Sequence, residues 1–137
     1  MQNILIISID SLRPEALSCS PKHFSVAETF PYFLWTPTLD KLAKDGVLFS
    51  TLICQAPFTP ASHASFFTGL NVPTHGIRGF FGYKLLEQTE TLAERLKQEG
   101  YHTAAFLGAD ALHRRYGLDR GFDVYDTEFD MKIDSWV

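Results

Sequence analysis

Residues 89–107 read Thr-Glu-Thr-Leu-Ala-Glu-Arg-Leu-Lys-Gln-Glu-Gly-Tyr-His-Thr-Ala-Ala-Phe-Leu, and this stretch decides the expected fold. Apolar residues recur at helical spacing as far as Leu96, which predicts a helix over 89–99, and Gly100 is a typical helix stop. Residues 101–107 then have the composition of a strand. A helix followed directly by a strand is the repeating unit of a parallel sheet.

The same order occurs earlier in the chain. A helix is expected over 36–46, where Thr36 caps its start and Gly46 closes it, and a strand over 47–54. The Ile-rich run 3–9 predicts a strand that is buried on both faces. We therefore expect an α/β fold, with a doubly wound, mostly parallel sheet flanked by helices. Shorter elements are expected as helices within 57–69 and 110–116 and a strand at 121–125, with loops at 18–35 and 71–83.

Composition limits the classes of function. The chain has 137 residues, of which 45% are hydrophobic, and this suits one globular domain. Its net charge of -4 and the lack of a Lys/Arg run argue against nucleic acid and membrane surfaces as partners. Cys19 and Cys54 are too few for a disulfide framework, so reduced, partly buried thiols are expected. The N-terminal apolar run lacks a basic flank and stops at Asp10, so neither a signal peptide nor a membrane span is predicted and a cytoplasmic protein is expected.

The run Phe-Thr-Pro-Ala-Ser-His-Ala-Ser-Phe-Phe-Thr-Gly, residues 58–69, is the strongest candidate for a functional site. It places the Thr59 hydroxyl beside a proline turn at the start of a short helix. A helix N-terminus attracts anions, because its first N–H groups lack intrahelical partners and its dipole favours negative charge. A hydroxyl at this position is placed to attack an anionic ester. The alternative is that Thr59 or Ser62 only caps the helix.

Asp10 is the second candidate, because it directly follows the expected strand 3–9. Ligands of open α/β sheets bind at the carboxyl ends of the strands, so a carboxylate here is well placed for chemistry. The alternative is that Asp10 only forms a turn or a cap.

Four stretches together carry a resemblance to a known family. They are Ile6-Ile7-Ser8-Ile9-Asp10-Ser11-Leu12-Arg13-Pro14-Glu15; Thr36-Pro37-Thr38-Leu39-Asp40-Lys41-Leu42-Ala43 with Gly46-Val47 and Phe49; the run 58–69 continued to Pro73-Thr74-His75-Gly76; and Thr91-Leu92-Ala93-Glu94-Arg95-Leu96-Lys97 through Gly100-Tyr101, with Gly121-Phe122-Asp123. In order and spacing they resemble the N-terminal part of the alkaline phosphatase superfamily, in its sulfatase branch and its type I phosphodiesterase branch. The resemblance covers nearly the whole chain.

The sulfatase branch uses the motif Cys-x-Pro-Ser-Arg, whose cysteine is converted to formylglycine. Thr59 stands at the position of that cysteine, and a threonine cannot be converted. Ala61 replaces the proline of the motif, Ser62 agrees with it, and His63 replaces the arginine. Cys54 is followed by residues that do not fit, so formylglycine chemistry is not expected.

Threonine at this position is what the phosphodiesterase branch uses, in the pattern Thr-x-Pro-Asn-His, and sulfatase-like proteins with Thr-x-Pro-Ser-His resemble this sequence most. The resemblance implies a metal-dependent hydrolase of sulfate or phosphate (di)esters, in which a metal-bound threonine attacks and water cleaves the covalent ester. The implied residues are Thr59 and His63 in catalysis, Asp10 and Thr59 on a divalent zinc, manganese or calcium ion, and Ser62 and Arg78 on a small anionic ester substrate. Ser11 departs from the second aspartate that is common in sulfatases.

Family members draw their remaining metal ligands from later parts of longer chains. After Asp126 the only aspartates of this sequence are Asp130 and Asp134, and no histidine follows. Residues 1–137 are therefore expected to be the N-terminal portion of the hydrolase domain, which ligates the metal only in part and associates with itself or with a missing C-terminal portion. The alternative is a non-catalytic α/β binding or assembly module, or an inactive remnant of the family.

Overall fold

The structure is a computed structural model that describes residues 2–20 and 35–127. The chain divides into two compact units, Met1–Ile53 and Cys54–Val137. Most of the loop expected at 18–35 lies outside the described residues.

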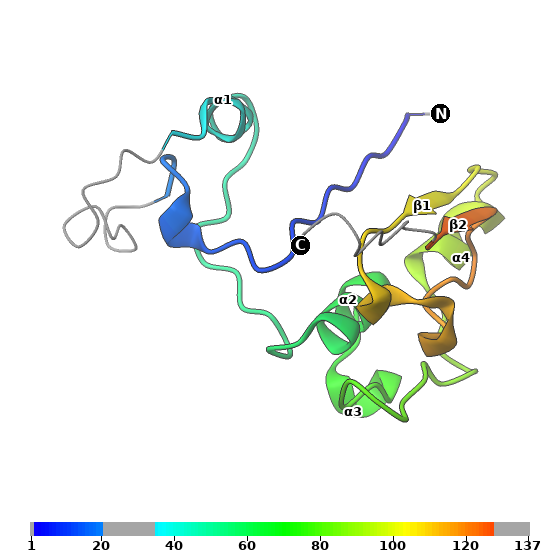
Figure 1. The fold of residues 1–137 in the computed structure, drawn as a ribbon. Helices are drawn as coiled ribbons and strands as arrows, with labels where there is room; N and C mark the ends of the chain where they lie inside the picture. Colours follow the sequence, from blue (N-terminus) through cyan, green and yellow to red (C-terminus); the bar gives the residue numbers. More distant parts are fainter. Residues whose placement is uncertain (1, 21–34, 128–137) are drawn as a thin grey trace, which may run out of the picture. The chain divides into compact units, whose positions relative to one another are not determined.

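The first unit contains a short 3-10 helix, η1 (Pro14–Ala16), and the helix α1 (Pro37–Asp45) (Figure 1). α1 begins directly after Thr36 with a proline in its first turn, and the N–H of Gly46 donates to the carbonyl of Leu42 at its end, as the sequence predicts. Thr36 occupies the N-cap position as expected, but its side chain makes no cap hydrogen bond. The Thr36 hydroxyl donates to Asp40 Oδ1 at 3.1 Å instead of accepting from the helix backbone.

The strands expected over 3–9 and 47–54 are wrong as far as the structure describes these segments. Neither segment forms a ladder, and their apolar side chains are largely exposed, as Leu5 and Val47 illustrate. The apolar pattern of a central parallel strand encodes burial on two faces, but strand hydrogen bonds need neighbouring strands. Among the described residues of the first unit no such partner strand is formed.

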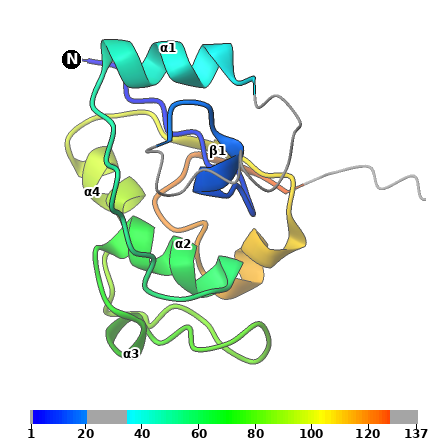
Figure 2. The ribbon, with the colours of Figure 1, turned by 90° about the vertical axis from the view of Figure 1, so that its left-hand side faces the viewer.

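The second unit has helices and a small parallel sheet in alternation, which confirms the α/β class. Its elements in order are α2 (Thr59–Thr68), α3 (Val72–His75), α4 (Leu92–Gln98), β1 (Ala104–Phe106), the 3-10 helices η3 (Asp110–Leu112) and η4 (Arg114–Tyr116), and β2 (Val124–Asp126). The strands pair in parallel, with Ala104 opposite Val124. α2 is the central element, in contact with α3, η3 and α4 (Figures 1 and 2). In place of the single helix expected at 110–116, the chain forms the two 3-10 helices η3 and η4.

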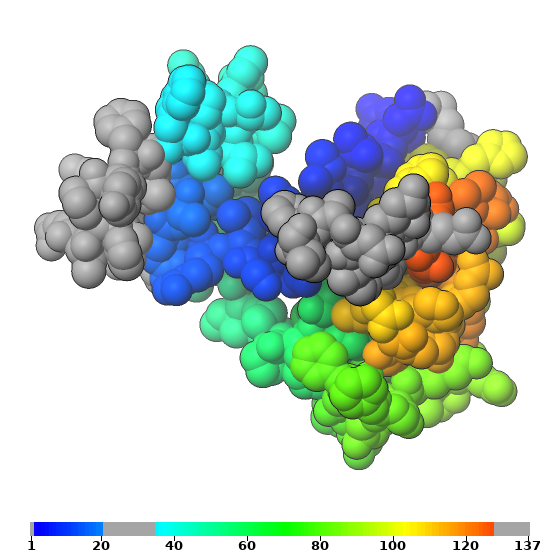
Figure 3. Space-filling view, in the orientation of Figure 1, coloured from blue at the N-terminus to red at the C-terminus, as the bar shows by residue number. Residues whose placement is uncertain are grey.

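The core of the second unit lies under α2. Ala61 and Ala64 of this helix are fully buried, and their small side chains let other segments approach its backbone closely. The remaining buried members of the cluster are Ala56, Ile77, Leu85, Leu112, Tyr116 and Leu118. Because Tyr116 donates to the carbonyl of Phe80 and accepts from the N–H of Leu85 through its own carbonyl, the loop after α3 packs against η4. Figure 3 shows these green and orange segments in contact.

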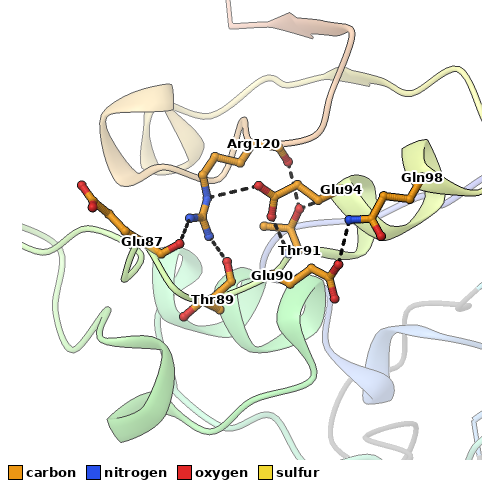
Figure 4. A network of polar contacts seen from close by, with 7 residues as sticks. All are labelled: Glu87, Thr89, Glu90, Thr91, Glu94, Gln98 and Arg120. Atoms are coloured by element: carbon orange, nitrogen blue, oxygen red, sulfur yellow. Dashed lines mark hydrogen bonds and ion pairs between the residues drawn. The ribbon is translucent and has the colours of Figure 1, made fainter.

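α4 is fixed at its N-terminus by a polar network (Figure 4). Thr91 and Glu94 form a capping box. The N–H of Glu94 donates to the hydroxyl oxygen of Thr91, and the N–H of Thr91 donates to the carboxylate of Glu94. The Thr91 hydroxyl also donates to the carbonyl of Arg120 at 2.9 Å, and the Arg120 guanidinium donates to the carbonyls of Glu87 and Thr89. The segment before β2 is therefore attached to the start of α4. Among the helices that the structure describes, none is long and apolar enough to cross a membrane.

Candidate active site

Thr59 is the first residue of α2, and its hydroxyl does not cap the helix. The N-cap is Phe58, whose backbone is extended (φ -146°, ψ 147°) and whose side chain makes no cap hydrogen bond. Ser62 donates to the carbonyl of Thr59 at 3.1 Å, so it does not cap the helix either. The capping alternative for these two residues is therefore wrong. Within the described part of the chain, the Thr59 hydroxyl has no hydrogen-bond partner.

Backbone N–H groups at the N-terminus of α2 lack intrahelical acceptors. The first helical bond runs from the N–H of Ser62 to the carbonyl of Phe58 at 3.1 Å. The N–H groups of Thr59 and Ala61 precede it and have no intrahelical acceptor, and Pro60 has no N–H at all. Two backbone donors therefore lie beside the Thr59 hydroxyl, on the end of a ten-residue helix whose dipole favours negative charge.

His63 lies one turn along the same helix. Its Nδ1 is 3.0 Å from the carbonyl oxygen of Thr59. Since a carbonyl oxygen only accepts hydrogen bonds, Nδ1 carries the proton in this contact. The ring also packs against Phe67, with the ring centroids 6.3 Å apart. The first turn of α2 thus brings together Thr59, Ser62 and His63, all of them half-buried.

Arg78 lies in the loop after α3 and is exposed. Its Nη2 donates to the carbonyl of Pro73 at 3.4 Å. In the residues that the structure describes, no hydrogen bond or ion pair joins Arg78 to the first turn of α2. Its role in binding an anion therefore stays a prediction.

Asp10 belongs to the first unit, where it lies exposed in a turn. Ser11 next to it has a left-handed backbone (φ 57°), and its hydroxyl is 3.5 Å from Asp10 Oδ1. The turn that the sequence left open as an alternative is thus observed. The role of Asp10 as a metal ligand is a separate matter and stays a prediction.

The described residues do not assemble a metal centre on their own. Over residues 2–20 and 35–127, no three His, Cys, Asp or Glu side chains come together in a group that could hold an ion. Both cysteines are free thiols; Cys19 is half-buried, as expected, whereas Cys54 is exposed.

His75 has a structural role that sequence reasoning missed. It is completely buried, and its Nδ1 accepts a hydrogen bond from the N–H of Ile77 at 3.2 Å. Nε2 therefore carries the proton and donates to the hydroxyl of Ser65 on α2 at 3.0 Å. Burial lowers the pKa of His75, because an apolar environment disfavours the imidazolium ion. The sequence contains His75 only as part of a Pro-Thr-His-Gly run, and nothing in that spacing predicts burial.

One hollow of the second unit lies away from all of these residues. A cavity of about 700 Å³ lies along β2, and none of the residues expected at the functional site lines it. Its lining residues are His113, Arg114, Val124, Tyr125, Asp126 and Thr127.

Comparison with known proteins decides the family. The model of the Sulfatase family matches residues 2–134, which is nearly the whole chain. The chain belongs to the sulfatase family. Sulfatases are sulfuric ester hydrolases and are generally metal-dependent, so the sulfatase branch of the resemblance is confirmed at the level of the family.

Individual sulfatases agree with this assignment. The chain is 30% identical over 101 residues to an arylsulfatase of Clostridium perfringens, a match to 74% of this chain and 19% of the relative. It is 28% identical to arylsulfatase D of Homo sapiens (90% of this chain, 22% of the relative) and 31% identical to a sulfatase of Formosa agariphila (88% and 23%). The sequence thus spans about a fifth of the length of these sulfatases. No solved structure gives a significant match.

Proposed function

We propose that the protein to which this chain belongs hydrolyses sulfate esters with Thr59 as the nucleophile. The observation that carries the proposal is the position of Thr59 at the start of α2, where its hydroxyl caps nothing and lies beside two backbone donors without intrahelical acceptors. Membership of the sulfatase family supplies the reaction class.

In the proposed reaction the Thr59 oxygen attacks the sulfur of the ester and gives up its proton. A sulfur–oxygen bond forms to Thr59, the bond to the organic oxygen breaks, and the alcohol leaves with that electron pair and a proton. Water then attacks the sulfur of the covalent threonine ester, which releases sulfate and restores the hydroxyl. The N–H groups of Thr59 and Ala61 are suited to stabilise negative charge on the transferred group.

His63 and Ser62 have supporting roles in this proposal. Nδ1 of His63 and the hydroxyl of Ser62 both donate to the carbonyl oxygen of Thr59. The two side chains therefore fix the backbone that carries the nucleophile. Arg78 is proposed to bind the sulfate oxygens, because a guanidinium suits oxyanions.

A divalent ion is expected because the family is generally metal-dependent. Such an ion activates a hydroxyl and offsets negative charge when it is bound. The described residues alone do not hold one, so no step above depends on it. Asp10 is proposed as one ligand on the sequence resemblance alone. Replacement of Asp10 by Asn in the full-length protein is then expected to weaken the binding of zinc or manganese in calorimetry, and unchanged affinity would remove Asp10 from the proposal.

The second candidate is a phosphodiesterase, and one observation favours it. Thr59 stands where the sulfatase motif has its cysteine. Threonine is the residue that the phosphodiesterase branch, which this sequence also resembles, uses at that position. The ratio of kcat/KM for two substrates measures which transition state an enzyme binds better.

The test compares 4-nitrophenyl sulfate with bis(4-nitrophenyl) phosphate, using the full-length protein with zinc or manganese. The higher kcat/KM for the sulfate supports a sulfatase, and the higher value for the phosphate supports the second candidate. If neither ester is turned over and calorimetry detects no metal binding, the non-catalytic binding module is favoured instead.

A further inference from the structure

Among the buried residues of α2, Ser65 has the side chain that reaches another element. The buried residues of this helix are Pro60, Ala61, Ala64 and Ser65. The methyl groups of the alanines pack by contacts without a preferred direction, whereas a hydrogen bond fixes both distance and angle. The hydroxyls of Ser62 and Thr68 donate to carbonyls of α2 itself. The Ser65 hydroxyl instead accepts at 3.0 Å from Nε2 of His75, the last residue of α3.

His75 is itself fixed from several sides, so it provides a constant reference point. Its side chain is completely buried, and its Nδ1 accepts from the N–H of Ile77 at 3.2 Å. Its carbonyl accepts from the N–H of Leu86, also at 3.2 Å. Gly76 follows with a left-handed backbone (φ +90°), and an added Cβ there would lie 2.8 Å from Cγ of Leu86. Neither the imidazole nor the backbone that carries it can move far without breaking these contacts.

The helix α2 carries the position of Ser65 to Thr59. The two residues lie six positions apart on the same helix, a distance of about 9 Å along its axis. The bond from the N–H of Ser62 to the carbonyl of Phe58 closes the first turn, and the N–H of Gly69 donates to the carbonyl of Ser65 at 2.8 Å at the other end. Because a hydrogen-bonded helix moves as a body, a shift at Ser65 displaces the Thr59 hydroxyl and the neighbouring N–H groups together.

We propose that His75 is a positioning residue for the reaction: its hydrogen bond to Ser65 places the Thr59 hydroxyl for attack on the ester. The inference rests on the proposed function, in which Thr59 is the nucleophile. Attack requires the reacting atoms to lie about 3–3.5 Å apart, and a displacement of about 1 Å, even one caused far from those atoms, can slow a reaction about a hundredfold. Binding of the unreacted ester depends less on that distance, so the contact should act on kcat more than on KM.

Two uncharged variants separate the hydrogen bond to Ser65 from the one to Ile77. The amide nitrogen of Gln stands as many bonds from the backbone as Nε2 of histidine, so His75→Gln can still donate to Ser65. The amide oxygen of Asn matches Nδ1 instead, so His75→Asn can still accept from Ile77 but does not reach Ser65. Ser65→Ala removes the same hydrogen bond from the other side.

The test measures the hydrolysis of 4-nitrophenyl sulfate by the full-length protein, with the folded fraction taken from near-ultraviolet circular dichroism. His75→Asn and Ser65→Ala are expected to lower kcat about ten- to a hundredfold and to change KM less than about threefold, whereas His75→Gln recovers most of kcat. Thr68→Ala is the matched control and should keep the wild-type kcat, because this hydroxyl of α2 bonds to the carbonyl of Ala64 in the same helix. A role of His75 in stability alone would lower the folded fraction of its variants and leave kcat per folded molecule unchanged.

Hydrogen exchange of residues 58–64, read by mass spectrometry, follows the start of α2 independently of turnover. His75→Asn is expected to raise the exchange above that of the wild type, and His75→Gln to leave it close to the wild type. In an active protein, equal kcat for the two His75 variants would overturn the inference, and so would equal exchange. If the wild type releases no nitrophenol, or if Thr59→Ala releases it at the wild-type rate, the proposed function fails. Exchange that still differs between the two variants then keeps the placement of α2 by His75, and equal exchange removes it.

Discussion

Nε2 of His75 lies 3.0 Å from the hydroxyl of Ser65, and this buried contact joins α3 to the helix that begins with Thr59. The histidine also accepts from the N–H of Ile77, so both ring nitrogens are used. Protonation would place a donor on Nδ1 opposite the N–H of Ile77 and break that bond. The packing of α2 against α3 therefore depends on a neutral imidazole.

The first prediction is that this contact makes stability depend on pH. Burial lowers the pKa of His75 below its ordinary value of 6.5, so the unfolded chain binds the proton more readily than the folded one. The stabilising contribution is then present above pH 6.5 and is lost as the pH falls below it. Unfolding midpoints measured between about pH 7.5 and pH 5.5 should fall with pH more steeply in the wild type than in His75→Gln. An equal slope for His75→Gln would contradict this account, and His102→Gln, at a fully exposed histidine, is the control.

The second prediction concerns the start of α4. Thr91→Ala removes an oxygen that accepts from the N–H of Glu94 and donates to the carbonyl of Arg120, so we expect a loss of about 1–2 kcal/mol in the free energy of unfolding. Thr91→Ser keeps the hydroxyl and should recover most of that loss. Chemical denaturation measures both variants, and an alanine variant as stable as the serine variant would show that the capping box contributes little.

The third prediction compares two glycines with left-handed backbones. Gly121 (φ +86°) and Gly82 (φ +76°) both favour glycine over other residues, but only at Gly121 would a Cβ collide with backbone atoms of Ala93 and Glu94. Gly82→Ala should therefore cost only the strain of its backbone, about 1–2 kcal/mol. Gly121→Ala should destabilise the protein clearly more, because α4 and the segment before β2 would have to separate. Equal midpoints in thermal unfolding would refute the close packing of these two segments.

The fourth prediction concerns acid. The ammonium of Lys97, 2.5 Å from Asp123, and the N–H of Thr103 lower the pKa of the Asp123 carboxyl from 3.8 to about 2. A depressed carboxyl pKa stabilises the folded state above pH 3.8, and this contribution is lost as the pH falls toward 2. Asp123→Asn should lower stability at neutral pH and flatten the pH dependence in that window. Titration of the carboxyl by NMR gives its pKa directly, and an ordinary value would count against the ion pair.

Local signals explain why some elements could be predicted from the sequence. Thr91, Glu94 and Gly100 define α4 through contacts within a few residues, and Thr59 is first in α2 because Pro60 favours a helix start. The prediction of strands at 3–9 and 47–54 failed for a physical reason. Apolar runs encode burial, whereas the hydrogen bonds of a strand depend on partner strands far along the chain. His75 could not be predicted as a buried link, since the partner that defines it, Ser65, lies on another helix.

The roles of Thr59, Ser62, His63, Arg78 and Asp10 in chemistry remain predictions from the resemblance. The structure confirms only that the first three share one helical turn.

If Thr59 attacks the ester, then removal of its hydroxyl must stop the release of the alcohol. The full-length protein, its Thr59→Ala and Thr59→Ser variants, and Thr74→Ala at an exposed threonine of α3 are compared for the release of nitrophenol from 4-nitrophenyl sulfate. We predict that Thr59→Ala lowers kcat by about a thousandfold or more, that Thr59→Ser keeps measurable turnover, and that Thr74→Ala matches the wild type. Turnover by Thr59→Ala at the wild-type rate would contradict the claim.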